Sequence, residues 1–178
     1  MTIPGPEPQI GLGVIAPPDF TRDRELWRWV PGNVTLFVSR TGPVEACDNL
    51  AFNQALAHPD VLTRPAREVR TAGAGAIAFA CTACSFVRGP DAERALRDAM
   101  GTDLPTVTAA GATVQALDAV EARRIAVVHP YAPDVAVRLA SFLTAAGFDV
   151  VSTKGVELRH SDVTYTQVSD LVTRSDSA

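Results

Sequence analysis

The chain has few cysteines, no long hydrophobic run and no basic leader. Its three cysteines, two of which are three positions apart, do not form the even, widely spaced pattern of a secreted disulfide-rich protein. No stretch reaches the roughly 20 apolar residues of a membrane span, and the proline-rich start lacks the charged and apolar regions of a signal peptide. The sequence therefore predicts a cytoplasmic protein with no membrane partner.

A basic surface is also lacking. The formal net charge is −4, and the arginines are scattered along the chain instead of forming a block, which argues against a nucleic-acid partner. What the chain does have is a hydrophobic content of 47% over 178 residues. This is enough apolar material to bury a core in one domain or in two small lobes.

Short apolar runs alternate with amphipathic segments of helical length, the pattern of a parallel sheet covered on both faces by helices. Strands are expected at residues 10–16, 34–39, 77–80, 106–108, 125–128 and 149–152. Helices are expected at 21–27, 44–57, 60–71 and 91–100, from Ala112, from Pro133 to just before Gly147, and at 162–174. The sequence thus predicts an α/β fold.

The pattern divides the chain into two lobes. Residues 1–9 are expected to form an N-terminal tail, 10–120 a first α/β lobe with four strands, and 121–178 a second α/β lobe that restarts after the polar stretch 121–124. The second lobe supplies only two predicted strands, and two strands rarely make an independently stable sheet. We therefore expect parallel sheets flanked by helices in both lobes, with the second lobe incomplete.

Cys81 lies where the apolar run 76–80 ends, and ligands usually bind at such strand ends in an α/β sheet. Small residues and then a helix follow it, so backbone N–H groups and a positive helix end favour thiolate over thiol. Its sequence position makes Cys81 a candidate nucleophile.

Two alternatives compete with this interpretation. Free cysteine is among the most buried residue types, so the residue type alone favours a packing role for Cys81. Cys81 and Cys84 also form a CxxC motif, which occurs in redox pairs and in zinc sites. A zinc site needs two more ligands, and the three histidines have no ligand-like spacing. A thioredoxin-like pair is expected after the first strand with an aromatic residue beside it, whereas this motif follows the third, so both interpretations rank below catalysis.

Five blocks of sequence, taken in order, are similar to one known family. They are 10–19 (IGLGVIAPPD), Asp23 with Glu25, Val34 and Thr35 with Arg40, 80–89 (ACTACSFVRG) and 124–131 (RIAVVHPY). In this order and spacing, the chain resembles the maleate cis-trans isomerase and arylmalonate decarboxylase branch of the Asp/Glu racemase superfamily over residues 10–175.

The resemblance implies two similar α/β lobes with the active site between them. It places Cys81 as the catalytic cysteine of the first lobe. It also implies that Thr82 and Ala83 offer loop N–H groups to the substrate, and that Tyr131 closes on it. Asp19 stands where the family usually has a carboxylate-binding asparagine, and a carboxylate there repels a dicarboxylate unless it is protonated or turned away.

The implied activity is isomerisation of a small dicarboxylate, maleate to fumarate, without a cofactor or metal. Related racemases use a cysteine on each side of the substrate, whereas arylmalonate decarboxylases keep only the second cysteine. That second cysteine is expected on a strand after the helix that ends near Arg174, and this chain holds no such residue. Racemisation, decarboxylation or an inactive homologue therefore stay open as alternatives.

A subunit contact is left open by two neighbouring tryptophans. Trp27 and Trp29 lie two positions apart, so they cannot share one face of a helix. One of them is therefore available for an intermolecular contact, and a homo-oligomer is compatible with the sequence. The other partner that we expect is the small carboxylate substrate.

Overall fold

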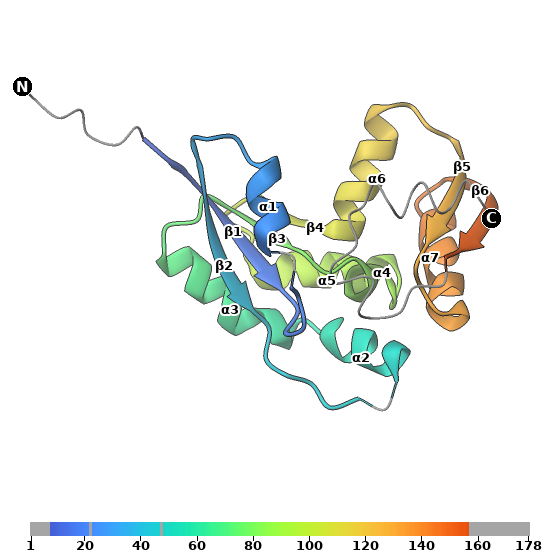
Figure 1. The fold of residues 1–178 in the computed structure, drawn as a ribbon, viewed down its shortest axis with the longest axis horizontal. Coiled ribbons are helices and arrows are strands. Elements are labelled where there is room, and N and C mark those ends of the chain that lie inside the picture. Colours follow the sequence, from blue (N-terminus) through green and yellow to red (C-terminus); the bar gives the residue numbers. More distant parts are fainter. Residues whose placement is uncertain (1–7, 22, 47, 157–178) are drawn as a thin grey trace, which may run out of the picture.

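The computed structural model describes residues 8–21, 23–46 and 48–156 as an α/β protein with parallel sheets flanked by helices (Figure 1). The predicted helix 162–174 lies outside the described residues. The elements in chain order are β1 (Ile10–Ala16), α1 (Asp23–Trp29), β2 (Val34–Arg40), α2 (Asn49–Leu56), α3 (Asp60–Thr71), β3 (Ala76–Phe79), α4 (Thr82–Phe86), α5 (Pro90–Met100), β4 (Thr106–Thr108), α6 (Ala109–Ala119), β5 (Arg124–His129), α7 (Pro133–Ala145) and β6 (Asp149–Gly155).

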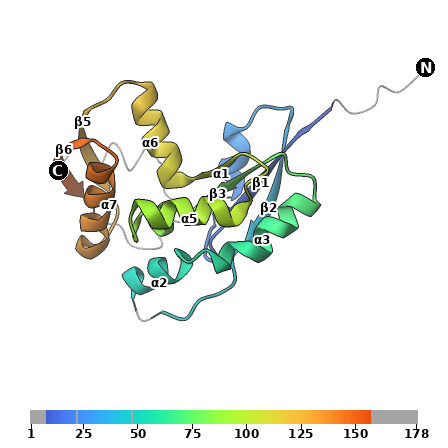
Figure 2. The same ribbon diagram turned by 180° about the vertical axis from the view of Figure 1, so that it is seen from behind.

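The first sheet has four parallel strands in the order β2-β1-β3-β4. Crossovers between parallel strands are right-handed. Helix α1, which connects β1 to β2, therefore lies on one face of the sheet, and α3 and α5, in the connections that lead back to β3 and β4, lie on the other. Accordingly, α3 and α5 contact each other on one face, as Figure 2 shows from behind. The chain reverses direction across the sheet after β2, and β1 and β3 lie side by side at this switch point.

Two glycines allow β1 to approach its neighbours closely. A Cβ atom on Gly13 would lie 2.7 Å from Cγ2 of Val69, which α3 contributes to the core. A Cβ atom on Gly11 would lie 2.6 Å from the carbonyl oxygen of Gly73. These glycines therefore serve strand and helix packing, which is how a glycine inside a strand is usually explained.

The second sheet consists of β5 and β6, which pair in parallel with a register shift between Ile125 and Ala126. The helix that connects them, α7, buries Val135, Phe142 and Leu143. These side chains belong to one hydrophobic cluster with Phe86 of α4 and Ala110 of α6. A separate cluster, built on side chains such as Ile15 and Phe79, fills the interior beside the first sheet.

Most differences from the predicted elements occur at helix starts. The helix predicted from residue 44 begins at Asn49, because the carboxylate of Asp48 accepts the N–H of Ala51 at 2.7 Å and caps the helix there. The helix predicted from Ala112 begins at Ala109, because Thr108 caps it by accepting the N–H of Gly111. Helix α4 was not predicted as a separate element.

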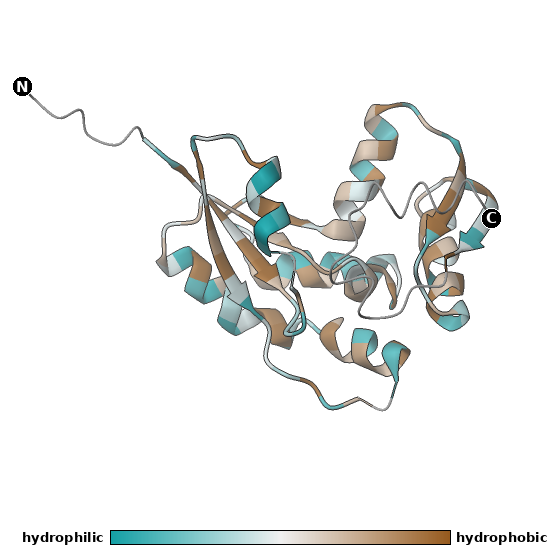
Figure 3. Cartoon of the chain, in the orientation of Figure 1, coloured by the Kyte–Doolittle hydropathy of each residue, from teal (hydrophilic) through white to brown (hydrophobic). Residues whose placement is uncertain are grey.

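The surface helix α1 differs from the other helices in hydropathy. Figure 3 shows it as mostly hydrophilic, and none of its residues is buried. Trp29 at its end is 85% exposed and Trp27 is 50% exposed. Among the described residues, no helix is long and apolar enough to cross a membrane.

Candidate active site

Cys81 lies between β3 and α4, at the carboxyl edge of the first sheet. It is the N-cap residue of α4, and its Sγ accepts the backbone N–H of Cys84 at 3.3 Å. Its side chain is buried, with 8% of the residue exposed. The sequence predicted this place at the end of a strand, because the apolar run stops one residue earlier.

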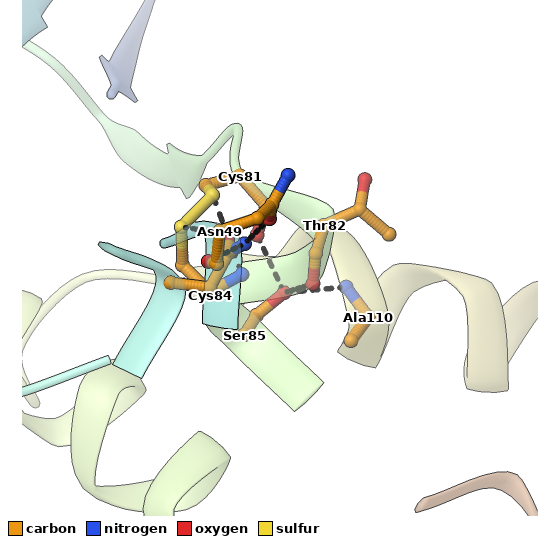
Figure 4. The surroundings of a disulfide bond; sticks show 7 residues. Asn49, Cys81, Thr82, Cys84, Ser85 and Ala110 are labelled. Carbon is orange, nitrogen blue, oxygen red and sulfur yellow. Dashed lines mark hydrogen bonds between the residues drawn. A yellow bond between two sulfur atoms is a disulfide. The ribbon is translucent and has the colours of Figure 1, made fainter. Parts of the chain in front are cut away.

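The sulfur of Cys81 is bonded to the sulfur of Cys84 in this structure (Figure 4). We expected a reactive thiolate, and in the disulfide form Cys81 has no thiolate to attack with, so its role as nucleophile stays a prediction for the reduced protein. The physical reason for the disulfide is local. A CxxC motif that opens a helix places its first and fourth residues one turn apart, here with their Cα atoms separated by 5.4 Å. A nucleophilic role therefore requires the reduced pair.

Asn53 of α2 lies against the pair. Its Oδ1 is 3.4 Å from Sγ of Cys84, while its Nδ2 donates to the carbonyl oxygen of Asn49 at 2.8 Å. The bond from Nδ2 fixes the orientation of the amide, so the oxygen is the atom that faces the sulfur. Asn53 is itself buried.

Ser85 ties the cysteine segment to a second helix, as Figure 4 shows. Its hydroxyl shares its one hydrogen between the carbonyl oxygen of Cys81, at 2.7 Å, and that of Thr82, at 2.8 Å. The same Oγ accepts the N–H of Ala110, in the first turn of α6, at 3.1 Å. The backbone around Cys81 is therefore held by contacts that do not involve the sulfur.

Thr82 and Ala83 form the first turn of α4, not the loop that we expected. The first N–H groups of a helix have no acceptor within it. The backbone N–H groups of Thr82 and Ala83 are therefore still hydrogen-bond donors, as the resemblance implies. The Thr82 side chain is exposed and Ala83 is buried. Whether they bind a substrate stays a prediction.

Tyr131, in the segment between β5 and α7, meets the first lobe at α4. Its ring packs edge-on against Phe86 with centroids 5.4 Å apart, and it stacks on His129 at 5.9 Å. Burial raises the pKa of the phenol, and a hydrogen bond with the hydroxyl of Thr82 only partly opposes this. The tyrosine is therefore neutral around pH 7, and the fold brings Thr82 and Tyr131 together across the two lobes.

A cavity of about 410 Å³ lies beside this contact. Thr82 and Tyr131 line it together with apolar side chains from α6, β5 and α7, among them Leu117, Val127 and Phe142. Thr113 and His129 also line it, so a few polar groups border a mainly apolar space. Cys81 is not among the lining residues, although Thr82, the next residue in the chain, is one of them.

Asp19 lies in the turn after β1, where the N–H of Phe20 donates to the carbonyl oxygen of Pro17 at 3.2 Å. Its side chain is exposed. Strands β1 and β3 are adjacent, so the Asp19 turn and Cys81 emerge at the same edge of the sheet. A role of Asp19 in binding carboxylates stays a prediction.

Sequence reasoning missed the polar residues that organise this edge. Ser85 and Asn53 gave no signal, because their partners are backbone and side-chain groups distant along the chain. Arg40 was named as part of the family resemblance, and its partners were not foreseen: it donates to Asp23 at 2.6 Å and to the carbonyl oxygen of Pro17 at 3.2 Å. Among the described residues, no group of three or more His, Cys, Asp or Glu side chains is arranged to hold a metal ion.

The fold and site define a class: an α/β protein with parallel sheets flanked by helices and a cysteine at the carboxyl edge of the first sheet. Residues 36–177 match the model of the arylmalonate decarboxylase family. The chain belongs to this family.

The similar proteins include both maleate isomerases and arylmalonate decarboxylases. A maleate isomerase from Nocardia farcinica is 30% identical over 98 residues, which are 51% of this chain and 39% of that protein. A structure of the N. farcinica maleate cis-trans isomerase, a cysteine-to-serine mutant with a covalently bound succinylcysteine intermediate, is 22% identical with a TM-score of 0.73. It matches 95% of this chain and 73% of its own.

A liganded double mutant of arylmalonate decarboxylase is 24% identical with a TM-score of 0.78, and the match covers 96% of this chain and 73% of that one. At these identities the two structures establish the shared fold. The stretch matched by the curated isomerase is well under two thirds of that protein's length.

Proposed function

We propose that the reduced protein catalyses a cysteine-dependent cis-trans isomerisation of a small dicarboxylate, maleate to fumarate, with Cys81 as the nucleophile. The observation that carries the proposal is the position of Cys81 as the N-cap of α4, where its sulfur accepts a backbone N–H. A structure of a related isomerase with the same fold holds a succinylcysteine intermediate, which is the adduct expected from attack of a thiolate on maleate.

The proposed reaction begins when the Cys81 thiolate attacks one alkene carbon of maleate. The C–S bond forms, the alkene electron pair moves to the neighbouring carbon, and a proton adds there. Rotation about the resulting single bond follows. Loss of the proton and expulsion of the thiolate then form fumarate, so the enzyme is regenerated and no cofactor is consumed.

Thr82 and Tyr131 supply the polar groups for the substrate carboxylates in this proposal. Both line the same cavity, one from each lobe, and Thr82 directly follows Cys81 in the chain, so in this proposal the substrate lies at the edge of the cavity next to the cysteine. Because burial raises the pKa of Tyr131, its phenol keeps the proton that a hydrogen bond to a carboxylate needs. The first-turn amides of Thr82 and Ala83 are further donors.

Decarboxylation of an arylmalonate is a second candidate, favoured by one specific observation. The cavity beside Thr82 and Tyr131 is lined mainly by apolar side chains, which suit an aryl group better than a second carboxylate. The family to which the chain belongs is also named for this activity.

The two candidates are separated by offering both substrates to the protein kept in dithiothreitol. We expect fumarate to form from maleate, followed by proton NMR, and we expect turnover to be lost in Cys81→Ser because a hydroxyl is a far weaker nucleophile. Cys47 is the third cysteine and lies outside the CxxC motif. Cys47→Ser is therefore the matched control, and it should keep full turnover.

Release of carbon dioxide from phenylmalonate without any formation of fumarate would assign the decarboxylase instead. A folded, reduced protein that converts neither substrate contradicts both proposals. Unchanged isomerisation by Cys81→Ser contradicts the role of this cysteine.

The charge of Asp19 bears on the substrate in the same proposal. An ionised carboxylate at this edge repels a dianion. We expect Asp19→Asn to lower the KM for maleate while kcat changes less, measured by initial rates at low ionic strength, where the repulsion is least screened. An unchanged KM would place Asp19 outside the substrate site.

A further inference from the structure

The two sulfurs of the CxxC motif lie in different surroundings although they belong to one helical turn. Cys81 is 8% exposed, whereas Cys84 is 1% exposed and belongs to the hydrophobic core of the first sheet. The structure joins them in a disulfide with a Cα separation of 5.4 Å, within the usual range of roughly 4.4–6.8 Å. The backbone of this turn therefore accommodates the bond.

We propose that Cys81 and Cys84 form a reversible thiol–disulfide switch, in which Cys84 is the resolving cysteine and the disulfide form is inactive. The effect on turnover rests on the proposed function, since it assumes that the Cys81 thiolate attacks the substrate. The thiol chemistry of the pair does not.

Cys81 is the sulfur that reacts first. It is the more exposed of the two, and its Sγ accepts the N–H of Cys84, a hydrogen bond that favours a thiolate. Thiolates that a small oxidant can reach are the ones oxidised. A peroxide is small enough to use the limited access that a buried side chain allows.

Cys84 is suited to stay protonated until it is needed. Its Sγ lies 3.4 Å from Oδ1 of Asn53, and this oxygen can only accept a hydrogen bond. In the reduced pair the S–H of Cys84 donates to it, which favours thiol over thiolate. The Nδ2 group of Asn53 is engaged with Asn49, so the amide does not turn a donor toward the sulfur.

The oxidation balances with hydrogen peroxide as the oxidant. The Cys81 thiolate attacks one peroxide oxygen, the O–O bond breaks, and Cys81 becomes a sulfenic acid while hydroxide leaves and takes up a proton. The Cys84 sulfur then attacks the sulfur of the sulfenic acid. The S–O bond breaks, and the hydroxyl leaves with the Cys84 proton as water. Two thiols are oxidised and one peroxide is reduced to two waters.

The rest of the site does not depend on the state of the sulfurs. Ser85 holds the carbonyl oxygens of Cys81 and Thr82 and the N–H of Ala110, and none of these bonds uses a sulfur atom. A dithiol reductant therefore returns the pair to its reduced form within the same backbone. The switch acts by removing the nucleophile, not by unfolding the site.

The experiment uses the full chain, reduced, freed of reductant and treated with hydrogen peroxide, after which free thiols are blocked with N-ethylmaleimide and the intact mass is measured. We expect the loss of two hydrogens, one blocked thiol out of three, and a Cys81–Cys84 cross-linked peptide. Turnover of maleate should be lost with the same time course and should return with dithiothreitol.

Two variants identify the resolving role. In Cys84→Ser, the sulfenic acid on Cys81 has no partner, so we expect oxidation to the sulfinic acid and a loss of turnover that dithiothreitol does not reverse. Cys84→Ala tests the same point if serine at this buried position does not fold. Cys47→Ser is the matched control, and its pair should oxidise and recover like that of the wild type.

The outcomes separate the two proposals. Three blocked thiols after peroxide, in a protein that turns over maleate, overturn the switch, and so does a peroxide-treated Cys84→Ser in which Cys81 carries neither a sulfenic nor a sulfinic acid. If the Cys81–Cys84 disulfide forms and is reduced again, but the reduced protein converts no substrate, the thiol chemistry is supported and the proposed function is contradicted.

Discussion

Ser85 shows how one buried hydroxyl can hold the segment around a reactive cysteine. It donates to the carbonyl oxygens of Cys81 and Thr82 and accepts from the N–H of Ala110, so it connects β3, α4 and α6. Its side chain is buried, with 2% of the residue exposed. Buried polar groups that lose a partner cost free energy, because water cannot replace the bond.

We expect Ser85→Ala to lower the free energy of unfolding by about 1–3 kcal/mol, because it removes the acceptor of the buried N–H of Ala110. The measurement is urea unfolding followed by circular dichroism. Ser141→Ala is the matched control: Ser141 is exposed and donates only to the carbonyl oxygen of Val137 within α7. Equal effects of the two substitutions would contradict the role assigned to Ser85.

Tyr131 makes the free energy of unfolding depend on pH in the alkaline range. Burial raises the pKa of its phenol above the value of about 10 that it has in the unfolded chain. Above that pH the unfolded state loses a proton that the folded state keeps. The stabilising contribution is therefore complete below pH 10 and is lost as the pH rises through the folded pKa.

We expect the free energy of unfolding of the disulfide form to fall less between about pH 9 and 11 in Tyr131→Phe than in the wild type. Denaturant unfolding at several pH values measures this slope. Keeping the disulfide intact removes the titration of Cys81 and Cys84 from the comparison. Parallel slopes for the two proteins would show that Tyr131 is not the buried titrating group.

At the scale of elements, the strands were predicted more accurately than the helices. Strands β1 and β4 were predicted at their observed bounds, because β1 is followed by two prolines and β4 is a short run of β-branched residues. Helix starts depend on single capping bonds, such as those made by Asp48 and Thr108. A capping residue is common along any sequence, so the one that acts is decided by what it meets in space.

The packing of β1 against α3 gives a test at this scale. Gly13→Ala places a methyl group 2.7 Å from Cγ2 of Val69, so we expect destabilisation of about 1–3 kcal/mol from overpacking. Gly32→Ala is the matched control, because a Cβ atom there meets nothing within 4 Å. Both are measured by thermal and urea unfolding.

Combining Gly13→Ala with Val69→Ala should cost less than the sum of the single changes, because the added methyl group enters the space that valine leaves. Strict additivity in this double-mutant cycle would contradict a direct contact between the two positions.

At the scale of the whole molecule, the two tryptophans of α1 lie outside the hydrophobic core. Trp29 is 85% exposed and Trp27 is 50% exposed, on a helix that buries none of its residues. Large exposed apolar side chains often mark contacts between molecules. This keeps the proposal that the protein associates with itself through α1.

We expect sedimentation velocity to show a concentration-dependent assembly that shifts toward monomer in Trp29→Ser. Val120→Ser is the control, because Val120 is also exposed, at 73%, but lies at the end of α6. A wild-type protein that sediments as a monomer at all concentrations contradicts the proposal.

The amino-acid sequence by itself determined the α/β class, the alternation of strands and helices, and the place of Cys81 at the end of β3. These follow from local patterns: the spacing of apolar residues along the chain and the residues that stop a strand. The order of blocks along the chain was also enough to indicate the family, which the match over residues 36–177 establishes.

Only the tertiary structure decided how these parts meet. It joined Cys81 to Cys84, brought Asn53 to the buried sulfur, and placed Thr82 of one lobe against Tyr131 of the other. The partners of the last two contacts lie far apart in sequence, so no local pattern specifies them. The CxxC motif is local, but its state depends on how deeply the fold buries each sulfur and on which groups it places beside them.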